Sequence, residues 1–247
     1  MIRLESISKS FDTNVALEDV SAVFNEGTTN LIIGRSGSGK TVLMKCLIGL
    51  LTADSGEIWY DEVPFNRLGT GQQRELRQQM GVVFQGGALF DSLTVEQNLR
   101  LPMDFFTEWG NGEKLDRINF CLERVNLPGT NRLYPAELSG GMKKRVAIAR
   151  AIVLNPKYLL CDEPNSGLDP QTAILIDNLI RKITLEFNTT TIINTHDMNS
   201  VMEIGENILF LHEGTKCWEG SRDGIMHSDN KILNEFVFAS ELMKKFK

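Results

Sequence analysis

The sequence predicts an α/β fold whose mostly parallel β-sheet is covered by helices on both faces. Short apolar and β-branched runs alternate with longer segments of helical periodicity, as in parallel strands joined by crossover helices. A glycine-rich segment, Gly34–Thr41, follows one predicted strand, and two carboxylates, Asp162 and Glu163, follow another. Because ligands bind at the carboxyl ends of strands in open α/β sheets, we expect both segments at one functional edge of the sheet.

The composition is typical of a soluble globular protein. With 247 residues, 42% of them hydrophobic and 23% charged, the chain can bury one substantial core. Its net charge of −6 weighs against a nucleic-acid partner, because nucleic-acid-binding domains usually carry a basic excess. The N-terminus has no signal-peptide pattern, and no apolar run reaches the roughly 18–20 residues that cross a bilayer. We therefore expect a cytoplasmic protein, in which any membrane role comes through a partner.

The cysteines are widely spaced and form no C-x-x-C pair, so neither a metal site nor a disulfide framework has the spacing it needs. Cys46 and Cys161 lie inside apolar runs. We expect small buried hydrophobic side chains in a reducing compartment.

The N-terminal part of the chain predicts β-strands around one helix. Leu4–Phe11 and Ala16–Phe24 alternate loosely in polarity and are expected to pair as antiparallel strands across the turn residues 12–14. The further elements predicted in this part are the buried strand Thr29–Ile33, the helix Val42–Ile48, and the short strands Glu57–Tyr60 and Gly81–Gln85.

The segment from Leu93 to Leu133 is helical in character and ends before Pro135. Its clearest apolar face combines Leu115, Ile118, Cys121, Leu122 and Val125, which recur at helical spacing.

The C-terminal part alternates between helices and strands. Ser139 is expected to cap a helix that runs to about Leu154, where Asn155 and Pro156 end it. A helix from about Pro170 to Leu185 then separates two short β-rich runs, Tyr158–Cys161 and Thr191–Asn194.

The glycine-rich segment, Gly34–Thr41, reads G-R-S-G-S-G-K-T and joins a predicted strand to a predicted helix. In that context, the pattern G-x-x-x-x-G-K-[ST] is a phosphate-binding loop. Its glycines let successive N–H groups point at an anion, and the helix N-terminus adds partial positive charge. Lys40 can reach the outer phosphates, and the Thr41 hydroxyl can ligate Mg²⁺. The sequence therefore predicts binding of a nucleoside triphosphate, against the alternative of an ordinary glycine-rich turn.

Two further polar segments complement this loop. Asp162 is placed to hold Mg²⁺, directly or through water, and Glu163 to orient and deprotonate the water that attacks the γ-phosphate. Ser139, Gly140 and Gly141 open a helix and are either a second anion-binding device or simply a helix start. Two phosphate-type sites in one chain suggest that the second serves another molecule's nucleotide.

The order of these motifs resembles that of the ATP-binding-cassette (ABC) ATPases, from Ile2 to about Gly220. The resemblance implies a P-loop NTPase (RecA-like) core with a mostly parallel sheet, an N-terminal antiparallel β subdomain and a helical insert. It implies one domain, residues 1–247, with the helical subdomain at about 86–138 and a C-terminal helical tail at about 222–247. The motifs that carry it are Gly34–Thr41, Gln85, Leu138–Gly141, Asp162-Glu163, Ser166–Asp169 and His196.

The resemblance also implies a head-to-tail homodimer that sandwiches two ATP molecules. Each ATP is held by one subunit's phosphate loop and by the other subunit's Ser139-Gly140-Gly141 segment. Catalytic roles fall on Lys40, Glu163 and His196, with His196 at the γ-phosphate. Asp169 would couple the two sites. The residues expected to bind ATP are Phe11, Gly34, Arg35, Ser36, Gly37, Ser38, Gly39, Lys40, Thr41, Val42, Gln85, Ser139, Gly140, Gly141 and Asp169, and those expected to bind Mg²⁺ are Thr41, Gln85 and Asp162.

Two of these assignments have a structural alternative. Phe11 occupies the position where the family stacks an aromatic ring on adenine, but it could instead be a strand residue packed in the core. His196 matches the family's switch histidine, whereas a lone histidine after a strand is more often structural or on the surface.

Arg35 and Met142 depart from the commonest family pattern. Met142 stands where glutamine is usual and would remove an amide from a ligand-facing turn. Together with residues 34–43 and 84–90, these departures resemble the ATPase subunits of MCE-associated (Mla-type) phospholipid transport systems. That resemblance implies phospholipid movement between membranes to maintain outer-membrane lipid asymmetry. The alternatives are a transporter for a sugar, amino acid or lipoprotein, and a soluble clamp acting on nucleic acid or ribosomes.

By the same resemblance, an integral-membrane permease docks at the helical subdomain, with MCE-domain and small accessory subunits as further partners. The ATPase would then lie on the cytoplasmic face of the inner membrane. Large apolar residues in the insert are expected to be mostly core, with a few forming a groove for a partner helix. These residues are Phe90, Leu93, Val95, Leu99, Leu101, Met103, Phe105 and Phe106.

The last segment of the chain predicts a terminal helix that covers the core, or alternatively contacts a second subunit. Three lysines at residues 244, 245 and 247 are too few to indicate a membrane surface. On the helix after Ser139, we expect Lys143, Lys144 and Arg145 to form a solvated face. The apolar residues of the terminal segment are Ile232, Leu233, Phe236, Val237, Leu242, Met243 and Phe246.

Overall fold

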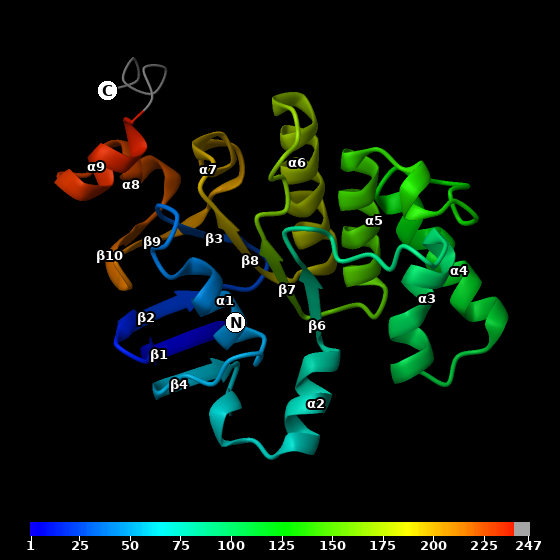
Figure 1. The fold of residues 1–247 in the computed structure, drawn as a ribbon, viewed down its shortest axis with the longest axis horizontal. Helices are drawn as coiled ribbons and strands as arrows, with labels where there is room; N and C mark the ends of the chain where they lie inside the picture. Colours follow the sequence, from blue (N-terminus) through cyan, green and yellow to red (C-terminus); the bar gives the residue numbers. More distant parts are fainter. Residues whose placement is uncertain (240–247) are drawn as a thin grey trace.

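The structure, a computed structural model, describes residues 1–239. It contains a four-stranded sheet in the order β2-β1-β4-β5 and a six-stranded sheet in the order β10-β9-β3-β8-β7-β6. Figure 1 shows the small sheet near one end of the long axis and helices α3 and α4 at the other. The predicted α/β class, with an N-terminal antiparallel sheet and a mostly parallel central sheet, is confirmed.

The small sheet is antiparallel, and tight turns join two of its strand pairs, β1 to β2 and β4 to β5. Its first strand pairs with the second and, on the other side, with β4. Ile2 and Leu4 of β1 face the core by alternation, and an irregularity between Leu4 and Ile7, where Ser6 has a left-handed φ of +52°, turns Ile7 to the core as well. The strands of this sheet are β1 (Ile2–Phe11), β2 (Asn14–Phe24), β4 (Ser55–Tyr60) and β5 (Val63–Pro64).

The large sheet has a parallel centre that aligns strand ends. Ile33 lies opposite Thr195, Asp162 opposite Asn194, and Val83 opposite Cys161. The carboxyl ends of four neighbouring strands therefore meet at one edge, as the sequence predicts. The strands are β3 (Thr29–Ile33), β6 (Met80–Val83), β7 (Tyr158–Asp162), β8 (Thr190–Thr195), β9 (Asn207–His212) and β10 (Thr215–Gly220).

Strand β3 is buried on both faces, which explains its continuous apolar run. Ile32 faces a core shared with α1 and the small sheet, whereas Leu31 and Ile33 face a second core shared with α5, α6 and α7. The α-helices are α1 (Lys40–Leu47), α2 (Thr70–Gln78), α3 (Val95–Phe106), α4 (Asn111–Arg124), α5 (Gly140–Ile152), α6 (Pro170–Phe187), α7 (Met198–Ile204), α8 (Arg222–Met226) and α9 (Lys231–Val237).

The predicted apolar face of α4 is wrong at one end. Ile118, Cys121 and Leu122 are fully buried, but Leu115 is 39% exposed. Lys114 occupies the buried side of that turn instead, because its ammonium group pairs with Asp104 on α3 at 2.7 Å while its aliphatic stem covers apolar surface.

The C-terminal helices pack on the central sheet. Phe236 of α9 stacks on Phe210 of β9 with 5.2 Å between ring centroids, and Leu233 and Val237 are buried. Within residues 1–239, no helix has the length and apolar character needed to cross a bilayer. Cys46, Cys121 and Cys161 are buried free thiols, as expected for Cys46 and Cys161. Leu242, Met243, Phe246 and the three terminal lysines lie outside the described residues.

Candidate functional site

The loop between β3 and α1 folds into a cradle that depends on two of its glycines. Gly34 and Gly39 have φ of +153° and +99°, and a Cβ at either position would approach a carbonyl oxygen to 2.3 Å or 2.6 Å. Among the described residues, no side chain caps α1, and the buried Ser38 hydroxyl has no hydrogen-bond partner. The cradle therefore presents free N–H groups and a hydroxyl, which are the donors that a phosphate group requires.

Lys40 is the first residue of α1, and its side chain extends back into this cradle. Its Nζ donates to the carbonyl oxygens of Gly34 at 2.9 Å and Arg35 at 3.0 Å. Burial lowers the pKa of Lys40, while the nearby carboxylates of Glu163 and Asp162 raise it. A cation held in this way can exchange its carbonyl partners for phosphate oxygens with little rearrangement.

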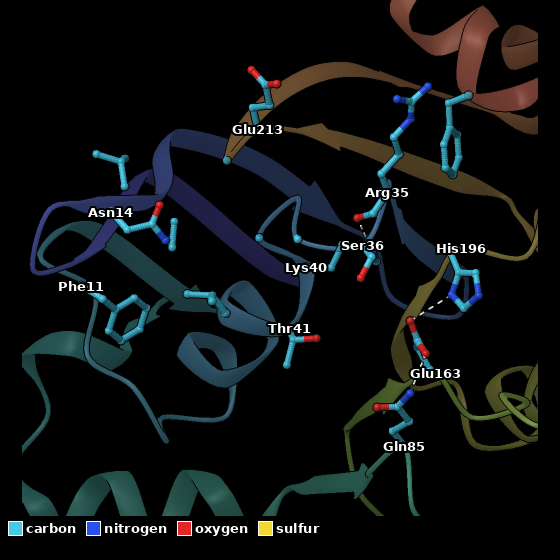
Figure 2. Close-up of a pocket in the computed structure, with 17 residues that line it drawn as sticks. Phe11, Asn14, Arg35, Ser36, Lys40, Thr41, Gln85, Glu163, His196 and Glu213 are labelled. Atoms are coloured by element: carbon cyan, nitrogen blue, oxygen red, sulfur yellow. Dashed lines mark hydrogen bonds and ion pairs between the residues drawn. The ribbon is translucent and has the colours of Figure 1, made fainter.

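Glu163 lies just beyond β7, at the edge where the strand ends meet. Its Oε2 accepts a 2.8 Å hydrogen bond from Gln85 Nε2, and its Oε1 lies 3.0 Å from His196 Nδ1 (Figure 2). The backbone of Glu163 is left-handed, with φ of +46°, a strained conformation for a residue with a side chain. Residues from the ends of β6, β7 and β8 thus converge on one carboxylate.

Oxygen donors suited to Mg²⁺ lie in the same region. Asp162 accepts a 3.1 Å hydrogen bond from Asn194 Nδ2, which also donates to the carbonyl of Lys40 and so ties β7 to α1. Because the amide nitrogen of Gln85 is engaged by Glu163, its amide oxygen is the group left for a cation. The hydroxyl of Thr41 completes a donor set of the hard-oxygen type that Mg²⁺ prefers.

These residues surround a cavity of about 840 Å³. Figure 2 shows Phe11 on one side of it, Glu163 and His196 on the other, and Lys40 and Thr41 between them. Phe11 is 42% exposed, so it is not a packed core residue. Of the predicted residues near this cavity, Gly34, Ser38 and Asp162 do not line it. Those that line it are Phe11, Arg35, Ser36, Gly37, Gly39, Lys40, Thr41, Val42, Gln85, Glu163 and His196.

Sequence reasoning missed several lining residues. Asn14 and Val15 follow Phe11 around the β1–β2 turn, so their position could have been predicted from that of Phe11. Glu213 belongs to the β9–β10 turn, whose Gly214 N–H donates to the carbonyl of Ser38. No sequence signal connected this turn with the phosphate-binding loop.

Ser139, Gly140, Gly141 and Asp169 are not part of this cavity. They line a separate cavity of about 430 Å³. Ser139 caps α5 by accepting a hydrogen bond from the N–H of Met142, and Asp169 caps α6 by accepting from Thr172. The hydrogen bonds from Thr172 hold the pKa of Asp169 below its usual value. The N-terminus of α5 and the phosphate-binding loop at the N-terminus of α1 therefore lie at two separate cavities.

Comparison with known proteins identifies the family. The sequence pattern of the ABC transporter family matches residues 17–166, more than half of the chain. The chain belongs to the ABC transporter family. A probable ribonucleotide transport ATP-binding protein of Mycobacterium leprae is 35% identical over 96% of this chain and 68% of its own length. The methionine import ATP-binding protein MetN of Campylobacter jejuni is 34% identical over 98% of this chain and 77% of its own length.

Solved structures agree with this assignment. A bacterial ABC transporter cassette solved as a dimer matches with a TM-score of 0.83 and 32% identity, covering 90% of this chain and 99% of the other. The same cassette is also known as a dimer in a post-hydrolysis state, bound to ADP and phosphate. The present chain is accordingly an ABC ATPase.

The expectation of a solvated face on α5 of this ABC ATPase is wrong. Lys144 is only 8% exposed, and its Nζ donates to the carbonyl oxygen of Gln85. Arg145 donates to the carbonyl oxygens of Val125 and Asn126, which close the end of α4. Helical periodicity alone did not reveal these contacts, because long cationic side chains bury their stems while their charged ends find oxygen partners.

Asp177 is a buried carboxylate of this ABC ATPase that sequence reasoning also missed. It lies on α6, is 2% exposed, and accepts hydrogen bonds from Asn165 Nδ2 at 3.2 Å. Asn165 also donates to Ser200 on α7 at 2.8 Å. Burial raises the pKa of Asp177 to about 6, and the nearby charges of Asp197 and Glu203 add to that shift.

Asp177→Asn is expected to stabilise the protein above pH 7 but not near pH 4. Because the pKa of Asp177 is raised on folding, the native state binds its proton more tightly, and wild-type stability falls as the pH rises from about 4 to 6. Asparagine does not titrate, so the variant should gain roughly 3 kcal/mol relative to the wild type across that window. Chemical unfolding at pH 4.5 and pH 8 measures the difference, and exposed Asp116→Asn is the control. A gain that does not depend on pH would contradict the expectation.

Proposed function

We propose that this ABC ATPase acts as a homodimer bound to an integral-membrane permease and drives phospholipid movement between membranes. The main support for a homodimer is that the two features proposed to bind the phosphates of ATP, the phosphate-binding loop and the N-terminus of α5, lie at separate cavities. Lys40 lines one cavity, whereas Ser139 and Asp169 line another. Opposed copies of the chain would bring each cradle against the other copy's α5 N-terminus, which supplies the donors that one copy lacks. The dimeric form of the similar cassette supports this arrangement.

Within a closed site, Glu163 is the general base. It holds the attacking water and takes its proton while Gln85 and His196 fix the two oxygens of the carboxylate. Lys40 and the N–H groups of the cradle stabilise negative charge on the outer phosphates. Mg²⁺ would be held by Thr41, Gln85 and Asp162, and would add positive charge where the phosphate charge develops. Phe11 is placed to stack on the adenine ring at the other side of the cavity.

The helical subdomain offers a surface suited to a permease. Phe105 is 70% exposed on α3, and Phe90 and Phe106 are also exposed. They border an open cavity of about 630 Å³ with mostly apolar walls. An exposed apolar groove of this kind fits the apolar face of a partner helix. Other aromatic and aliphatic residues that line it are Phe84, Leu93, Leu101 and Leu154.

Phospholipid as the cargo is supported by the resemblance to MCE-associated ATPases. Met142 is one of the residues on which that resemblance rests. The curated relatives are named for ribonucleotide transport and methionine import, so an amino-acid importer is the second candidate. With phospholipid as cargo, we infer that the complex includes MCE-domain and small accessory subunits. The ATPase would then lie on the cytoplasmic face of the inner membrane, with no nucleic acid bound.

Copurification from the native host tests both permease and cargo. We expect the tagged chain, isolated from detergent-solubilised membranes, to bring a permease and an MCE-domain protein, with phospholipid detected by mass spectrometry. Recovery of a methionine-type permease would favour the second candidate, and recovery of ribosomal RNA or DNA would refute the transporter assignment.

Phe105→Glu is expected to abolish permease recovery in the same experiment. A charge in the apolar groove would be buried without a partner at the interface. The control is Leu185→Glu on α6, since Leu185 is 60% exposed and lies outside the groove. Equal permease recovery with both variants would contradict docking at α3. ATP titration of each purified variant checks that its nucleotide site is intact.

A further inference from the structure

We propose that Lys144 and Arg150 of α5 form a clamp on residues 85–88 that links Ser139 to Glu163. We call these two residues the α5 clamp. In the proposed homodimer, Ser139 meets the nucleotide held by the partner, whereas Glu163 belongs to the chain's own site. The clamp would therefore let closure at one ATP site set the catalytic carboxylate of the other. The inference rests on the proposed dimer.

The contacts of the clamp all go to the backbone of one short segment. Lys144 Nζ donates to the carbonyl of Gln85, and Arg150 donates to the carbonyls of Gly87 at 2.8 Å and Ala88 at 2.7 Å. This segment lies between β6 and α3 and has no regular secondary structure. Gly87 and Ala88 both have left-handed φ, at +77° and +48°. Besides one turn hydrogen bond, from the N–H of Gly87 to the carbonyl of Phe84 at 2.7 Å, the segment is held by these external hydrogen bonds from α5.

Both cationic side chains of the clamp are removed from water. Burying a charge costs free energy, so keeping these side chains buried without a function would be costly. Burial lowers the pKa of Lys144 and of Arg150, while the charge of Glu163 raises that of Lys144. An ammonium group removed from water is retained only where hydrogen bonds and an opposite charge compensate for its lost hydration. Lys144 has both, because its hydrogen bond goes to Gln85 and its electrostatic partner is Glu163.

The clamp completes a continuous path between the two sites. Ser139 caps α5, and Lys144 lies five residues later on the same helix. Gln85 accepts from Lys144 through its carbonyl and donates to Glu163 through its side-chain amide. Glu163 in turn contacts His196. Because α5 is a single helix with a buried apolar face, a shift at Ser139 moves Lys144 with it.

The decisive experiment uses Lys144→Met in the full chain, which removes the charge and the donor but keeps an unbranched side chain. We expect ATP binding to be unchanged, kcat to fall about a hundredfold, and the Hill coefficient for ATP to fall to about 1. Lys144→Arg should restore most of both, because the guanidinium can donate to the same carbonyl. The matched control is Lys143→Met, since Lys143 has no hydrogen bond to residues 85–88 within the described chain.

The Hill coefficient separates coupling from a merely structural role. Loss of stability alone would lower the amount of active protein and leave cooperativity unchanged, so thermal unfolding is recorded for each variant. Wild-type kcat and cooperativity in Lys144→Met would overturn the proposal, as would a folded Lys144→Arg as impaired as Lys144→Met. If Lys144→Met does not fold, Arg150→Lys serves in its place. The Arg150→Lys variant is compared with Arg150→Met, which removes the charge and both donors to Gly87 and Ala88, and unchanged cooperativity in Arg150→Met overturns the proposal.

Failure of the clamp can be told from failure of the dimer. A wild type that stays monomeric with ATP and has a Hill coefficient of about 1 refutes the shared site itself. Cooperativity that is present in the wild type and persists in Lys144→Met refutes only the clamp. Light scattering with and without ATP on the wild type measures the oligomeric state directly.

Discussion

Glu163→Gln is expected to reduce ATP turnover by about 10²–10⁴-fold while leaving nucleotide binding intact. Glutamine has the shape of glutamate and keeps an oxygen for the amide of Gln85, but it cannot take a proton from water. In the structure, Gln85 and His196 hold both carboxylate oxygens of Glu163. The loss of turnover should therefore come from the loss of proton transfer and not from a displaced side chain. Steady-state phosphate release and nucleotide titration measure the two effects separately.

The same variant should accumulate as an ATP-bound dimer. Hydrolysis is the step expected to reopen the closed state, so a chain that binds ATP without hydrolysing it remains closed. Size-exclusion chromatography with light scattering detects the dimer. The control is Glu123→Gln on the exposed surface of α4, which should turn over ATP at the wild-type rate. Near-normal turnover by Glu163→Gln would remove the assignment of Glu163 as the base.

The sequence predicted this edge of the fold because its signals are local. A glycine-rich loop after β3 and two carboxylates at the carboxyl end of β7 each follow a run of buried strand residues. Parallel register then determines that both lie at the same edge, and Ile33 opposite Thr195 with Asp162 opposite Asn194 confirms that alignment. The fold class could be predicted for the same reason, since alternating strands and helices leave few arrangements.

What the sequence did not predict depends on contacts between distant segments. Lys144 and Asp177 are charged residues on helices, and their charge would suggest that they face solvent, yet they are buried with partners from residues 85 and 165. Leu115 shows the converse, because a charged neighbour, Lys114, takes the buried side of its turn through an ion pair with α3. A single sequence carries no signal for such partners. The β9–β10 turn at the nucleotide cavity was missed for the same reason.

Lys40→Ala and Ser139→Arg are each expected to abolish ATP turnover, through different halves of the proposed site. Lys40→Ala removes the cation held inside the phosphate cradle, so ATP affinity itself should be lost. Ser139→Arg places a large cation at the N-terminus of α5 but leaves the phosphate cradle of its own chain unchanged. The isolated Ser139→Arg chain should therefore capture ATP normally in a nucleotide titration and yet fail to hydrolyse it.

Mixing the two inactive variants should restore hydrolysis. In a mixed dimer, the Ser139→Arg chain contributes an intact cradle and the Lys40→Ala chain an intact Ser139, so one of the two shared sites is complete. With random pairing, half of the dimers are mixed and each has one complete site, so an equimolar mixture can reach at most about a quarter of the wild-type rate, and coupling between the sites lowers it further. Phosphate release is measured after the variants are mixed and allowed to exchange subunits, with each variant alone as the control. Two inactive chains cannot complement each other unless both contribute to one site, so recovery would establish sharing. Full turnover by a strictly monomeric Ser139→Arg chain would exclude it.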